Sequence, residues 1–171
     1  IKDFTKPVDI PAVDVPAGYT TLFVFPYSVG FQFSGFKNLA ALNEAITKRL
    51  KNLGVTTLLF MRHLELIEYE IKIPGKEASG EYLLDAEPVN DHCTRVSAIE
   101  SEDDKTDESL SFIKFSMPID SRVSTRTIDV AFTVATDKEG KTTFQKAKNP
   151  YISVYFPTET ESKLDFIVQG P

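Results

Sequence analysis

Alternation of apolar and polar residues is the feature that constrains this chain most, because a spacing of two fits only an extended strand. In residues 64–73, isoleucines and a tyrosine alternate with glutamates and a lysine, and a similar pattern returns in residues 127–134. Successive side chains of a strand point to opposite faces of its sheet. Each run therefore predicts a strand with one buried face and one solvated face.

The second of these runs also predicts which side chains face the core. We expect Ile128, Val130 and Phe132 to face inward and Asp129 to face solvent, because a register slip of one residue would turn the carboxylate inward. Neighbouring runs rich in β-branched and aromatic residues predict further strands of the same antiparallel sheet. They are residues 110–115, 141–144 and 151–156.

Two shorter runs, residues 20–25 and 55–61, are apolar or β-branched almost throughout and predict strands that are buried on both faces. The stretch from 76 to 108 has the weakest pattern. Within it, residues 81–84 have strand composition, and the acidic residues 101–108 predict a solvated loop with nothing apolar to bury.

One segment changes to the period of a helix. Leucines and isoleucines recur at threes and fours within residues 34–53, with Leu42, Ile46 and Leu50 on the face that we expect to pack on strands. The expected caps are Ser34 or Asn38 at the start and Gly54 after the end. Together these patterns predict an α+β fold, with a mostly antiparallel or mixed sheet and one principal amphipathic helix packed on it.

Composition limits the partners and the compartment. The chain has 171 residues and a formal charge of −6, which disfavours a surface that collects nucleic-acid phosphates. The single cysteine, Cys93, cannot form an internal disulfide, as expected for a cytoplasmic protein. No apolar run approaches the roughly 20 residues of a membrane helix, so we expect no membrane contact. The first residue is Ile, and we interpret the chain as a fragment of a longer protein.

Motifs with a specific chemistry are missing: there is no phosphate-binding glycine loop, no paired cysteine and no HExxH. His63 lies between two expected strands. A histidine at such a boundary more often makes a local hydrogen bond than takes part in catalysis. In Asp91-His92-Cys93 a thiolate would need the histidine as its base, but sequence neighbours rarely point at one another. The acidic residues 100–108 lack the spacing and the turn glycine of a calcium loop.

Four segments carry a resemblance to a known family. They read TTLFVFP, then KNLG at the end of the expected helix, then TTLLFMRHLELIEYEI, and finally ISVYFPTETESKLDFIVQGP. Their order resembles the ATP-binding proteins related to sacsin and to the ninety-kilodalton heat-shock chaperones. In that family an ATPase domain of the gyrase, chaperone and kinase type is followed by an α/β middle domain.

The resemblance implies a domain plan and a function. Residues 1–33 would be the lead-in and last strand of the ATPase domain, and residues 34–171 a region like the middle domain. ATP and magnesium would be bound by the parent protein, and no cofactor is expected in this fragment. Thr20 would lie on the adenine side of the nucleotide, although Tyr19 stands where the family has glycine. The arginine that reaches the γ-phosphate would follow Pro171.

On this hypothesis the chain is the structural and coupling region that follows the nucleotide pocket. The parent would be an ATPase, the fragment alone inactive, and the partners protein clients or the rest of its own chain, with a homodimer in the parent. The alternative is a free-standing β-rich interaction module without enzymatic activity. An asparagine-bearing helix and a glycine-rich lid encoded upstream of Ile1 would favour the first hypothesis.

Overall fold

The structure is a computed structural model, and it describes residues 17–18, 35–103, 105–119, 126–148, 150–154 and 156–170. The chain divides into two compact units, Ile1–Leu42 and Asn43–Pro171. The expected strand at residues 20–25, with Thr20, lies outside the described residues. A domain boundary between residues 33 and 34 stays a prediction.

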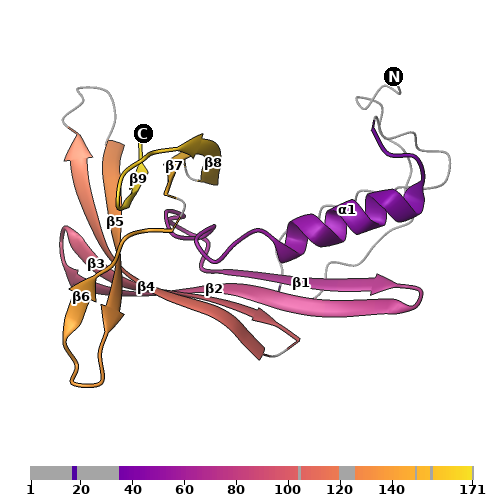
Figure 1. Cartoon of the computed structure of the whole chain (residues 1–171), viewed down its shortest axis with the longest axis horizontal. Helices are drawn as coiled ribbons and strands as arrows, with labels where there is room; N and C mark the ends of the chain where they lie inside the picture. Colours follow the sequence, from indigo (N-terminus) through magenta and orange to yellow (C-terminus); the bar gives the residue numbers. More distant parts are fainter. Residues whose placement is uncertain are drawn as a thin grey trace. The chain divides into compact units, whose positions relative to one another are not determined.

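The described residues of the second unit form a nine-stranded sheet (Figure 1). Five consecutive antiparallel strands, β1 to β5, make up most of it, and the short strands β9, β7 and β8 extend it beyond β5. The bounds are β1 Leu66–Ile73, β2 Lys76–Asn90, β3 Cys93–Glu102, β4 Lys105–Ile119, β5 Arg126–Thr136, β6 Thr142–Phe144, β7 Tyr151–Val154, β8 Phe156–Glu161 and β9 Ile167–Gln169. The strands predicted at 64–73, 110–115, 127–134 and 141–144 are thus confirmed. Their ends differ from these bounds by no more than two residues, except that β4 is longer than predicted at both ends.

The edge of β5 is shared by two strands. The end at Val134 pairs with Phe144 of β6, and the stretch from Asp129 to Ala131 pairs with β9. β9 runs parallel to its other neighbour, β7, because β8 reverses the chain between them. β9 is therefore hydrogen-bonded on both sides although it is only three residues long.

The predicted helix is present as α1, Leu39–Lys51. The side-chain oxygen of Asn38 accepts a hydrogen bond from the amide of Ala41 at 2.9 Å, which confirms Asn38 as the N-terminal cap. Lysines and an arginine occupy the last turn, where they oppose the negative end of the helix dipole. Gly54 has the expected positive φ, 85°.

The prediction of an α+β fold with the helix packed on the sheet is wrong, because the described structure is mostly sheet and the helix does not cover it. Ile46, expected in the core, is 38% exposed. Contact with the sheet is made at the C-terminal end, where the Tyr82 hydroxyl donates a hydrogen bond to the Leu50 carbonyl at 2.7 Å. A second contact there is the ion pair between Lys51 and Glu102.

Residues 55–61, which we name the turn segment, fill the place expected for the helix, and their predicted strand is also wrong. Successive turns are closed by hydrogen bonds from the amides of Thr57, Leu59 and Met61 to carbonyls three residues earlier, at 3.0, 3.1 and 2.9 Å. Leu58 and Leu59 are almost completely buried. A short apolar run cannot distinguish a buried strand from buried turns, because both lack a wet face.

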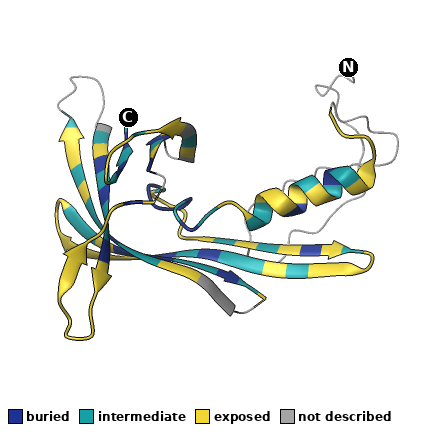
Figure 2. Cartoon of the chain, in the orientation of Figure 1, coloured by how far each residue is buried: buried dark blue, intermediate teal, exposed yellow. Residues whose placement is uncertain are grey.

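The turn segment packs on one face of the sheet, which we name the inner face. Fully buried residues of three adjacent strands, Val96, Phe112 and Ala131, form one cluster with the leucines of the turn segment. Figure 2 shows buried positions in the middle of the sheet and in the turn segment. The core thus consists of a sheet and an irregular segment.

The predicted facing of β5 is wrong as well. Asp129 is only 6% exposed and Ala131 is fully buried, whereas Ile128 is 40% exposed. The apolar residues of β5 lie instead on the outer face, where Phe132 contacts Phe115, Phe144 and Phe166 at ring-centroid distances of 6.1, 5.6 and 5.0 Å. Both faces of this strand carry apolar groups, so the larger apolar side chains do not identify which face is buried in the core.

The predicted acidic loop is also wrong over most of its length. Ser101 and Glu102 end β3, and β4 begins at Lys105. The reversal of direction is close to Asp103, whose φ is 49°. Asp103 also accepts a hydrogen bond from the amide of Ser79 at 3.1 Å, which ties the turn to β2. Backbone pairing with neighbouring strands outweighs the low β-propensity of these residues.

Gly80 has a packing role that can be tested. It lies directly opposite Tyr69 in the β1–β2 pair, and a methyl group added to it would overlap the tyrosine ring. We expect Gly80→Ala to lower the free energy of unfolding by about 1–2 kcal/mol in urea titrations, because the ring must move. In a Tyr69→Ala background the same change should be harmless. An equal cost in both backgrounds would contradict this role.

Candidate functional site

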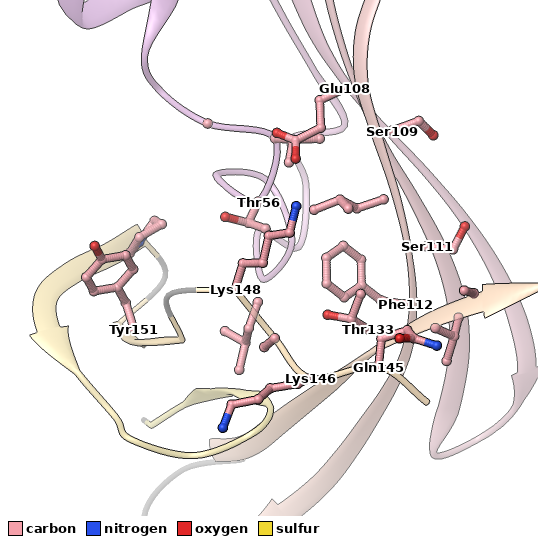
Figure 3. A pocket seen from close by; sticks show the side chains of 18 of the residues that line it. Thr56, Glu108, Ser109, Ser111, Phe112, Thr133, Gln145, Lys146, Lys148 and Tyr151 are labelled. Carbon is pink, nitrogen blue, oxygen red and sulfur yellow. The ribbon is translucent and has the colours of Figure 1, made fainter. Parts of the chain in front are cut away.

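A cavity of about 820 Å³ opens beside the core in the second unit. It lies between the turn segment, strands β4 and β5, and the connection at residues 145–148 (Figure 3). Its size is within the range of small-molecule sites.

The floor of the cavity is apolar and buried. Phe112 of β4, Val55 of the turn segment, Ala147 of the connection and Ile167 of β9 all contribute to it, and none is more than 9% exposed. Two hydrogen bonds hold the connection in place: Gln145 donates to the Thr133 carbonyl at 2.8 Å, and Ala147 donates to the Asp165 carbonyl at 3.0 Å. These bonds fix the connection to β5 and to the segment before β9.

Polar side chains surround the mouth. Figure 3 shows Lys148 extending across the cavity toward Thr56 and Glu108. Lys146 also lines the cavity, but it forms an ion pair of 2.7 Å with Asp165. The hydrogen bond and the charge of Asp165 raise the pKa of Lys146. Lys146 is thus already paired, whereas Lys148 has no ion-pair partner within 4 Å among the described residues.

A second group of polar residues lies on the inner face outside this cavity. Lys114 donates a hydrogen bond to the Leu59 carbonyl at 3.3 Å. Burial lowers the pKa of Lys114, the nearby positive charge of Arg62 lowers it further, and the negative charge of Asp129 opposes both effects. Arg62 donates a hydrogen bond to the Thr127 hydroxyl at 2.5 Å. The inner face therefore holds two opposite charges, Lys114 and Asp129, which we name the charge pair. They lie on the same face of neighbouring strands and interact through their charges, without an ion pair within 4 Å.

Gln169 extends this polar group across the sheet. It lies opposite Asp129 on one side and Ser153 on the other, and all three side chains are buried. The Gln169 side-chain oxygen has no hydrogen-bond partner in the described part of the chain. The row links the charge pair with Ser153, which also lines the cavity.

The residues singled out from sequence do not meet in a site. His63 and His92 are exposed, and the His92 amide donates to the Asn90 side chain in the β2–β3 turn at 2.9 Å. Cys93 is a partly buried free thiol at the start of β3. Among the described residues, no cluster of histidine, cysteine and acidic side chains is arranged to hold a metal ion.

Sequence reasoning considered Glu108 only among the acidic residues that could hold a cation, and it singled out neither Lys148 nor the pair of Lys114 with Asp129. The signal for the pair was present, because each charge interrupts an apolar strand sequence, SFIKFSM and TIDVAF. A charge in such a setting is usually paired when it is buried. Lys148 and Glu108 are exposed residues of polar stretches, and no sequence pattern distinguishes them.

Comparisons with known proteins gave no match to any family model, curated protein or solved structure. In the part of the chain that the structure describes, no helix is long and apolar enough to cross a membrane.

Proposed function

We propose that this chain is the structural and coupling region of a chaperone-like ATP-binding protein related to sacsin and the ninety-kilodalton heat-shock chaperones. The proposal rests on the order of the TTLFVFP, TTLLFMRHLELIEYEI and ISVYFPTETESKLDFIVQGP segments. In it, the parent protein hydrolyses ATP with magnesium in the cytoplasm, and Thr20 lies beside the adenine. Protein clients or other parts of the same chain are the partners, and the parent is a homodimer.

One structural observation supports a coupling role more than any other. β9 is paired with β5 on one side and with β7 on the other. Phe166, just before β9, packs against Phe132 at 5.0 Å, and Ile167 is buried in the core cluster. A loop that follows such a strand starts from a fixed point. This is the property needed to deliver a side chain to a phosphate.

Phe166→Ala in the full-length protein tests this role. The nucleotide would be bound elsewhere, so we expect the affinity for ATP to stay unchanged while the turnover number falls about tenfold, because the loosened strand misplaces the loop. Calorimetry and a phosphate-release assay measure the two quantities. Phe144→Ala is the matched control, because Phe144 also contacts Phe132 but is 67% exposed on β6. Equal losses of binding and turnover, or no loss of either, would argue against the coupling role.

The alternative of a free-standing interaction module has its own support. The outer face exposes large apolar side chains on β4 and β6, the strands that flank β5, with Phe115 42%, Met117 72% and Phe144 67% exposed. Contiguous exposed apolar surface commonly marks a protein contact. Titration of this chain with ATP tests the first proposal alone, because micromolar binding by the isolated chain would contradict the idea that the pocket lies outside it. An asparagine-bearing helix and a glycine-rich lid encoded upstream of Ile1 would discriminate between the two.

A further inference from the structure

We propose that the cavity beside the turn segment binds a carboxylate that carries an aromatic or aliphatic body. This inference is independent of the ATP-related function. It rests on the combination of a buried apolar floor and one available cation at the mouth. The floor, with Phe112 at its centre, would take the apolar body, since ligand sites are mostly apolar with a few converging polar groups.

The cation that selects a carboxylate is Lys148. Lys146 forms an exposed ion pair with Asp165, and in Figure 3 its ammonium group points away from Lys148 and Glu108. Lys148 reaches over the cavity in Figure 3, and Thr56 and Thr133 place hydroxyl groups on opposite walls. With its apolar body against the phenyl ring of Phe112, a ligand would therefore place its carboxylate among one ammonium group and the hydroxyl donors. Hydrogen bonds to charged groups are stronger than those between neutral groups, which favours a carboxylate over a neutral polar group.

Glu108 has the opposite effect to Lys148 on a bound anion. Its carboxylate lines the same mouth and faces the side toward which Lys148 points. It would repel a bound carboxylate and attract an ammonium group. Loss of Lys148 and loss of Glu108 should therefore change the affinity for an anionic ligand in opposite directions. A cavity that is only an imperfectly filled part of the core would show no such dependence on charge.

Two probes with the same apolar body and opposite charges test the proposal: 4-phenylbutyrate and 4-phenylbutylamine. Binding to the whole chain is followed by backbone amide chemical shifts. We expect 4-phenylbutyrate to bind more tightly, and to shift the amides of Val55, Thr56, Phe112, Thr133 and Lys148. Lys148→Met should weaken its binding about threefold to fivefold, and Glu108→Gln should tighten it about twofold, as for exposed charges. Lys138→Met removes an exposed lysine outside the lining and should change nothing.

Three results would overturn the proposal. The first is that 4-phenylbutylamine binds as tightly as 4-phenylbutyrate. The second is that neither probe binds at millimolar concentration to a protein whose spectrum is that of the native fold. The third is that the shifts gather on the outer face around Phe115 and Phe144, which would mean that the exposed aromatic surface binds the probe. All three variants replace exposed residues, so we expect them to fold.

Discussion

Leu59→Asp is expected to unfold the protein, whereas Ile46→Asp should leave it folded. Leu59 is fully buried in the turn segment, and an aspartate there would be a charge without a partner in an apolar core. The cost exceeds about 4 kcal/mol, which is a large part of the stability of an ordinary domain. Ile46 is 38% exposed on α1, so its aspartate stays in water and costs about 1–2 kcal/mol.

Circular dichroism on heating and in urea measures both changes. Leu59→Met is the control for the site, because it keeps the volume and apolar character and should cost less than about 1.5 kcal/mol. A native melting curve for Leu59→Asp, or unfolding by Ile46→Asp alone, would show that the helix and not the turn segment covers the sheet.

The contrast between these two positions shows what the sequence could predict. The helix itself was predictable in type and cap, because an amphipathic period of 3.6 and an Asn38 cap are local signals. Its partner was not predictable, because the face that a helix presents says nothing about which element covers the sheet. The turn segment took that place with Leu58 and Leu59, which looked like part of a strand.

Strands were predictable wherever one face is wet. Residues 64–73 alternate clearly, and β1 keeps Glu68, Glu70 and Lys72 exposed with Ile71 buried on the other face. In β5 the alternation was equally visible, but its larger apolar residues lie on the outer face with Phe132. Hydrophobic alternation gives the strand and its two faces, and it identifies the core face only when the other face is polar.

The candidate site was the least predictable part. The cavity is lined by segments from residue 54 to residue 167, which only the tertiary fold brings together. Two of its charged residues, Lys148 and Glu108, lie forty positions apart on elements without a shared motif. The buried pair of Lys114 and Asp129 is different, because an interrupted apolar strand is a local signal that could have been used.

That pair supports the second prediction. Lys114→Met and Asp129→Asn should each lower the free energy of unfolding by about 2 kcal/mol, because each leaves the other charge in the inner face with less compensation. The double variant should lose about 1 kcal/mol less than the sum of the two single losses, because it removes both charges together. Urea unfolding of the four proteins measures this coupling. Strict additivity would show that the two charges do not interact.

The pH dependence gives an independent measurement of the same pair. Because the pKa of Lys114 is lowered by folding, the unfolded chain binds more protons between that lowered value and the ordinary lysine pKa of about 10.4. The contribution of Lys114 to the free energy of unfolding should therefore rise with pH in this alkaline window, as its charge is lost in the folded state. In Lys114→Met that contribution is absent, so the difference between the two proteins should widen in favour of the native sequence as the pH rises through this window. In Asp129→Asn the rise should begin at lower pH, because the carboxylate no longer holds the proton on Lys114. Identical pH profiles for all three proteins would mean that Lys114 titrates as it does in water and is not part of a buried pair.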